Sequence, residues 1–92
     1  MESSKAAEQL ENWKQEVLTY HMKDPGRAIK ACAEIENYAQ KCQDSENLAF
    51  AYFYSGECYY DLNEINSMIG QMTNAVVYIS LSNQWELIAR AQ

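Results

Sequence analysis

A helical pattern of large and small side chains recurs along this chain with a period of about 40 residues, within the range of roughly 20 to 50 that is typical of helical arrays and solenoids. Each copy of its first half places a large residue, another residue four positions later and an aromatic residue three further on: Trp13, Val17 and Tyr20, then Tyr52, Gly56 and Tyr59. We therefore expect an all-α fold built from stacked antiparallel helix hairpins.

Helix start signals divide the chain into about five expected helices. Asp24, Asp44 and Asn63 are suited to accept hydrogen bonds from the free N–H groups of a first helical turn. Pro25 fits a first turn because its missing N–H has no partner there. Asn83 begins a further capping pattern. The expected helices span about 4–22 and 25–42 and begin near 45, 64 and 84.

The length of 92 residues predicts one small domain over 1–92, with 48% hydrophobic residues to form its core. Within it we expect one helix pair over about 4–43 and a second over about 45–81. A third pair is expected to begin over 83–92.

Charge and hydropathy exclude two classes of partner. The formal net charge of −6 opposes contact with the phosphates of nucleic acids. The longest apolar run, 48–54, is far shorter than the roughly 20 residues that cross a bilayer. The polar, acidic start of the chain lacks the pattern of a secretory signal. We therefore predict a cytoplasmic protein without nucleic-acid or membrane partners.

The repeat resembles the tetratricopeptide (TPR) repeat. In that family, a large residue precedes a small one by four positions and an aromatic residue follows by three, the order of Tyr52, Gly56 and Tyr59. A mid-helix glycine such as Gly56 indicates close contact between two helices, because it otherwise costs roughly 1 kcal/mol relative to alanine. The first copy departs from the family, since Val17 replaces the small residue. The resemblance implies a right-handed superhelix.

The resemblance also implies a concave groove lined by the first helix of each pair, which holds a protein or peptide partner. Aromatic side chains beside charged ones suit such a groove, because aromatic anchors dominate interface energetics. The alternative is that Phe50, Phe53 and Tyr60 only pack against neighbouring helices. The positions that the resemblance assigns to the groove are Lys14, Leu18, His21, Phe50, Phe53, Glu57 and Tyr60.

The inventory of reactive residues predicts neither an enzyme nor a metal or cofactor site. His21 is the one histidine, and helical spacing places no nucleophile beside it. Glu57 and Asp61 lie one turn apart, but acidic faces of this kind are usually solvated. The three cysteines lack metal-site spacing and are expected to be small core residues.

The last residues carry an apolar stripe that includes Trp85 and Ile88, which we assign to a self-association surface. Loosely matched repeats of this style resemble the N-terminal regions of bacterial signalling regulators such as GGDEF-type diguanylate cyclases. That resemblance implies a regulatory interaction module in a longer protein. Two alternatives remain, a homodimerisation element that uses the C-terminal stripe and a generic helical bundle.

Overall fold

The computed structural model describes residues 2–82, and over this range the chain forms four helices and no strand. They are α1 (Glu2–Tyr20), α2 (Pro25–Cys42), α3 (Ser45–Asp61) and α4 (Ile65–Ser82). The all-α prediction is confirmed. The described residues form four helices rather than about five, because the expected fifth helix lies outside them.

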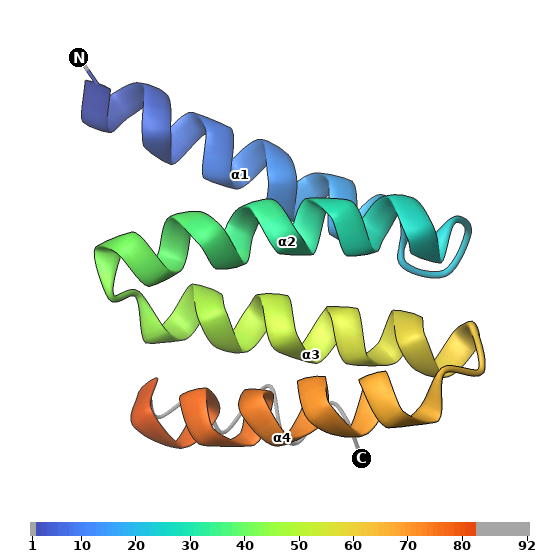
Figure 1. Ribbon diagram of the computed structural model, residues 1–92. Coiled ribbons are helices and arrows are strands. Elements are labelled where there is room, and N and C mark those ends of the chain that lie inside the picture. Colours follow the sequence, from blue (N-terminus) through green and yellow to red (C-terminus); the bar gives the residue numbers. More distant parts are fainter. Residues whose placement is uncertain (1, 83–92) are drawn as a thin grey trace.

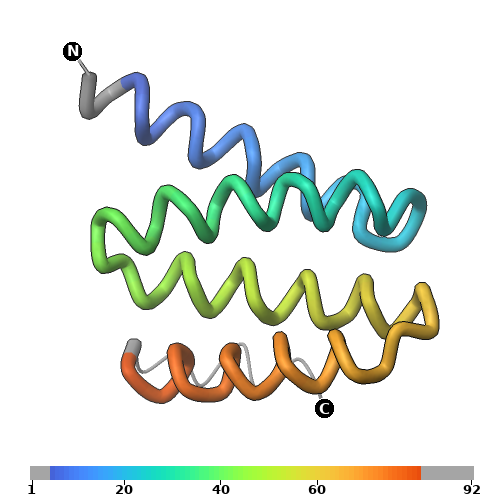
Figure 2. The backbone as a smooth tube through the Cα atoms, in the orientation of Figure 1, coloured from blue at the N-terminus to red at the C-terminus, as the bar shows by residue number. Residues whose placement is uncertain are grey.

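Helices that follow one another in the chain pack against one another, so the fold is a stack of antiparallel helices (Figure 1). α2, α3 and α4 run nearly side by side, whereas the N-terminal half of α1 diverges from α2 (Figure 2). α3 lies between α2 and α4 and holds eight buried residues, more than α2. It is therefore the central helix of the stack.

The turns confirm two of the three expected N-caps. Asp24 accepts a hydrogen bond from the Arg27 N–H at 3.3 Å, and Pro25 occupies the first turn of α2. Asp44 accepts from the Asn47 N–H at 3.1 Å and begins α3. Asn63 was expected to cap α4, and the structure corrects this: Asn63 has a left-handed φ of 63° in the turn after α3. Asparagine tolerates this conformation better than most residues do, so it closes one helix instead of starting the next.

Two hydrophobic clusters, both shared by α3, form the core. The first joins α1, α2 and α3 around Val17, Cys32 and Ile35, each at most 1% exposed. The second joins α2, α3 and α4 around Tyr52 and Ile79. Since every helix contributes apolar positions spaced by three or four residues, burying these rows drives the stacking.

Gly56 confirms the expected close contact of two helices. A Cβ at this position would lie only 3.0 Å from Cγ of Met72 on α4. The absence of a side chain therefore lets α3 and α4 approach closely. Gly70 is different, because a Cβ there would meet no atom within 4 Å.

The two hairpins place similar contacts at equivalent positions. Trp13 of α1 packs edge-on against Tyr38 of α2, with ring centroids 6.4 Å apart. Tyr52 of α3, the counterpart of Trp13 in the sequence repeat, stacks on Tyr78 of α4 at 5.6 Å. The first residues of α2 and α4 are 40 positions apart in the sequence, and so are their last residues. The sequence period thus coincides with the spacing of the α2 and α4 boundaries and of these aromatic contacts.

Candidate protein-binding surface

The first helices of the two hairpins, α1 and α3, run parallel and touch through their side chains. The Lys14 ammonium lies 5.1 Å from the centroid of the Phe50 ring. Further along, the ring of His21, the residue that follows α1, packs edge-on with Tyr54 of α3, with ring centroids 5.1 Å apart. Both contacts advance along the two helices in the same direction, so the side chains form two adjoining rows.

These rows define a surface that we call the α1–α3 face. Lys14, His21, Phe50 and Tyr54 are half-buried on it, whereas Leu18 is 44% exposed and Glu57 is exposed. Its members are Lys14, Leu18, His21, Phe50, Tyr54 and Glu57. Five of the seven residues predicted for the groove therefore lie together, joined by the ring contacts or placed on the same rows.

The other two predicted residues lie elsewhere. Phe53 is 9% exposed and belongs to the core cluster that α3 shares with α4, so we leave it out of the binding surface. Helical spacing puts Phe53 on the flank of the Phe50 row that meets α4, and there it packs in the core. Tyr60 is 63% exposed but lies to one side of the row, which continues by helical spacing from Glu57 to Asp61.

Tyr54 is the residue of this face that the sequence analysis did not assign. Its ring contacts three others, with centroids 5.1 Å from His21, 4.8 Å from Phe50 and 5.1 Å from Phe53. Aromatic pairs in such tilted or edge-on arrangements stabilise one another beyond the area they bury. The available signal was its spacing, because Tyr54 follows Phe50 by four residues and therefore shares its side of α3.

Charges are distributed unevenly along the α1–α3 face. The Lys14 ammonium is held over the Phe50 ring, where the ring's quadrupole attracts a cation. Toward the end of α3 the exposed charges are acidic, at Glu57 and Asp61. The face therefore carries charges of both signs, with Lys14 toward one end and Glu57 toward the other.

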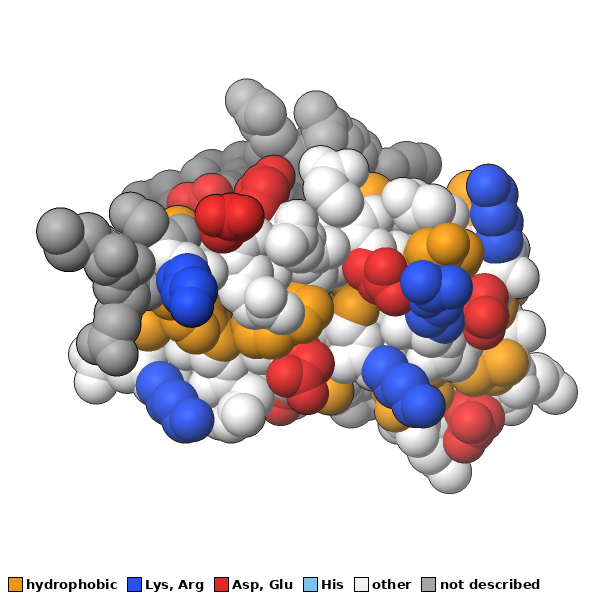
Figure 3. Space-filling view, turned by 90° about the horizontal axis from the view of Figure 1, so that it is seen from above, with side chains coloured by type: hydrophobic (Ala, Val, Ile, Leu, Met, Phe, Trp, Pro, Cys, Tyr) orange, Lys and Arg blue, Asp and Glu red, His pale blue; other side chains and the backbone are white. Residues whose placement is uncertain are grey.

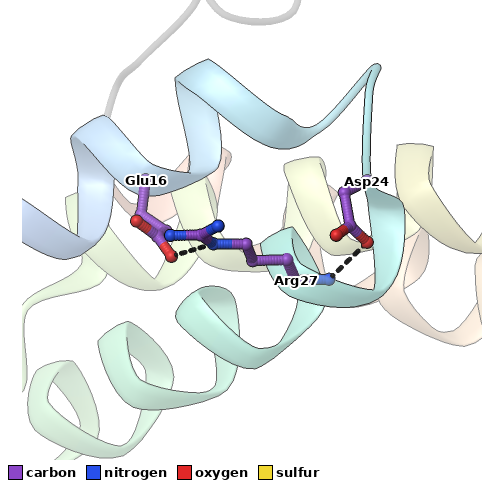
Figure 4. Close-up of polar contacts among 3 residues, drawn as sticks. All are labelled: Glu16, Asp24 and Arg27. Carbon is purple, nitrogen blue, oxygen red and sulfur yellow. Dashed lines mark hydrogen bonds and ion pairs between the residues drawn. The ribbon is translucent and has the colours of Figure 1, made fainter.

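A hollow of about 630 Å³ lies between α1 and α2, lined by side chains from the middle of α1 and from the first half of α2. Arg27 of α2 donates from Nε to Glu16 Oε2 of α1 at 2.6 Å (Figure 4). Its guanidinium carbon also lies 3.9 Å from the centroid of the Tyr20 ring. This hydrogen bond is the main reason that the pKa of Arg27 is raised. Acidic and basic side chains both flank the hydrophobic side chains in the view from above (Figure 3). Because its charges are mixed and partly paired, this hollow selects no ligand class.

The cysteines behave mostly as expected of core residues. Cys32 and Cys58 are buried, whereas Cys42 is exposed. Burial raises the pKa of Cys58 to about 11 and raises the pKa of Cys32 still further. These two thiols are therefore protonated at neutral pH and unreactive.

Several sequence predictions concern metals, membranes or the end of the chain. Within residues 2–82, no group of three or more metal-binding side chains comes together. Over the same part of the chain, every helix is too short or too polar to cross a membrane. The self-association surface assigned to Trp85 and Ile88 lies outside the described residues. Comparison with known protein families, with curated proteins and with solved structures finds no match for this chain.

Proposed function

We propose that this chain is a protein-interaction module of the tetratricopeptide type, and that its α1–α3 face binds a short peptide segment of a partner. The observation that carries this proposal is the parallel pairing of α1 and α3. It presents half-exposed aromatic rings and an exposed leucine beside charges of both signs. Such a mixture of rigid apolar anchors and polar rim is characteristic of binding surfaces.

Two further observations support the repeat architecture. The boundaries of α2 recur in α4 at one common interval, and the aromatic pair of the first hairpin recurs in the second. In a right-handed superhelix of such pairs, α1 and α3 would line the concave side. The regulatory role in a bacterial, cytoplasmic signalling protein stays a prediction from the sequence. A generic helical bundle is the alternative.

The length of the row and its charges set what we expect of the peptide. From Phe50 to Asp61 the row spans about 16 Å at roughly 1.5 Å per helical residue. An extended peptide of about five residues covers that distance. We expect an apolar residue to contact Leu18 and the half-buried rings of Phe50 and Tyr54, and a basic residue to lie beside Glu57. An acidic residue is expected at the Lys14 end.

Peptide selection tests the proposal. Random peptides of about twelve residues, more than twice the length that spans the row, are displayed on phage and selected on the folded chain. The best sequences are synthesised and titrated by calorimetry. We expect Leu18→Asp and Glu57→Lys each to weaken the selected peptide at least about tenfold, since both change exposed side chains of the face.

Glu34→Lys on α2 is the matched control, because it makes the same charge change at another exposed glutamate. It should leave the affinity unchanged. If Glu57→Lys and Glu34→Lys lose the same affinity for the peptide, the change in net charge explains both losses. The α1–α3 face would then be rejected as the binding surface. Selected peptides that bind all the variants equally would reject it as well.

A further inference from the structure

The last described helix, α4, exposes aliphatic side chains along its length. Between Ile65 and Leu81 five such side chains are 42% to 65% exposed. We call this surface the α4 outer face. Its members are Ile65, Ile69, Val76, Val77 and Leu81.

The arrangement of these residues suits contact with another helix. Ile65, Ile69 and Val76 are separated by four and seven positions and share one side of α4. Val77 and Leu81 form a second row, and Thr73 lies between the two rows. The Thr73 hydroxyl donates to the Ile69 carbonyl at 2.8 Å. Because this donor is already satisfied within the helix, covering it would leave no unpaired hydroxyl.

Gly70 is a second, independent feature of this face. It lies in the middle of α4, where glycine is unfavourable relative to alanine. At Gly56 the close approach of Met72 explains the glycine, whereas a Cβ at Gly70 would meet nothing within 4 Å. By helical spacing Gly70 shares a side with Val77 and Leu81. Close contact with another helix would explain the glycine at position 70, as close contact with Met72 explains Gly56.

Charge indicates what kind of partner fits. The chain carries a formal net charge of −6, so two copies repel each other over most of their surfaces. A two-fold symmetric contact brings the same patch of each copy together, and charged patches then place like charges face to face. α4 contains no Asp, Glu, Lys or Arg, whereas α1, α2 and α3 each contain several. Among the described helices, α4 is therefore the one that two copies can bring together without this repulsion.

We propose that the α4 outer face is a self-association surface, on which α4 of a second copy of this chain packs around a two-fold axis. A contact of one helix per copy lies near the lower end of the size range of specific interfaces. The dimer should therefore form and dissociate over accessible concentrations. The proposal goes beyond peptide binding, because α4 contributes no residue to the α1–α3 face.

Light scattering and sedimentation equilibrium on the full chain, from low micromolar to near-millimolar concentration, test the proposal. We expect the mass to rise from monomer to dimer in the wild type. Val76→Glu would place like charges in the contact and should weaken the dimer at least about 100-fold. Leu18→Glu on α1 is the matched control, because it puts the same charge on a comparably exposed aliphatic residue, and it should dimerise like the wild type.

Three results would overturn the proposal. One is a wild type that stays monomeric throughout, another is a dimer that survives Val76→Glu, and the third is equal weakening by Leu18→Glu. Circular dichroism of each variant at low concentration separates loss of contact from loss of fold. If the wild type is monomeric and Val76→Glu lowers the melting temperature of the dilute protein, a segment of the same chain covers α4 instead. Val76→Glu leaves the α1–α3 face unchanged, so it should bind the selected peptide with wild-type affinity. Titrating it with that peptide therefore distinguishes failure of the dimer from failure of the proposed function.

Discussion

The two hairpins share one local pattern but occupy different places in the stack. α1 has a neighbouring helix on one side, whereas α3 is enclosed by α2, α4 and the side chains of α1. As a result, Trp13 is half-buried while its equivalent Tyr52 is only 6% exposed. Likewise Thr19 is exposed, whereas Cys58, at the equivalent position of α3, is completely buried. Burial therefore depends on position in the stack and not on the repeat pattern alone.

The second helices differ in the same way. On α2, Glu36 accepts a hydrogen bond from the Tyr52 hydroxyl at 3.2 Å, and Gln40 donates to that hydroxyl at 3.4 Å. The equivalent positions on α4, Val76 and Ser80, are exposed. Thus α2 uses this side to hold the next helix, whereas the corresponding side of α4 is exposed.

Replacing the two equivalent aromatic residues by alanine should show the largest difference in lost stability between the hairpins. Tyr52→Ala removes a buried ring that stacks on Tyr78 and bonds two side chains of α2, so we expect a loss of about 3–5 kcal/mol. Trp13→Ala should cost less, about 2–3 kcal/mol, because part of that ring already contacts water. Urea unfolding followed by circular dichroism measures both. Equal losses would mean that enclosure of α3 adds nothing to the stability of its aromatic position.

The two mid-helix glycines should respond to the same substitution with opposite signs. At Gly56 an alanine Cβ must displace Met72, and overpacking of this kind costs about 1–3 kcal/mol, more than the gain in helix propensity. At Gly70 nothing lies within reach, so Gly70→Ala should stabilise the dilute protein by up to about 1 kcal/mol.

Thermal and urea unfolding at low micromolar concentration compare the two alanine variants with the wild type. Combining Gly56→Ala with Met72→Ala is the control, since the second change makes room for the new methyl group. A stabilising Gly56→Ala would show that the contact between α3 and α4 is looser than its geometry indicates.

A smaller effect concerns the pH dependence of stability. Burial raises the pKa of Cys58 from 9.0 to about 11. Between these values the unfolded chain loses a proton that the folded chain keeps, so stability falls as the pH rises. We expect the wild type to lose about 1 kcal/mol more than Cys58→Ala between pH 7 and pH 10.

Urea midpoints at both pH values provide the measurement, with Cys42→Ala as the control because Cys42 is exposed. The control should follow the wild type. If Cys58→Ala and the wild type lose the same stability, burial does not hold the Cys58 thiol in its protonated form.

Much of the fold could be predicted from the sequence because the signals are local. Asp24 with Pro25, and Asp44 alone, mark helix starts through bonds to residues three positions away. Asn63 failed as a start signal, since the same side chain also favours the left-handed conformation that ends a helix. Sequence offers no rule that decides between these two uses.

The candidate surface was harder to predict, because α3 has apolar residues on nearly all its sides. Phe50, Phe53 and Tyr54 lie close together in the sequence, and periodicity alone does not say which of them meets α1 and which meets α4. Phe53 was therefore assigned to the groove, although it belongs to the core. Tyr54 was not assigned to the groove, although it joins His21 to Phe50.

By itself, the sequence determined the helices, the N-caps of α2 and α3, the spacing of their apolar positions and the need for a small residue at Gly56. These follow from spacing within one helix and from bonds between near neighbours. Only the tertiary structure decided which side of each helix is covered. It enclosed α3, placed Lys14 over Phe50 and left the uncharged side of α4 open. The physical reason is that burial is shared among helices distant in sequence, so equivalent residues can end in the core or at the surface.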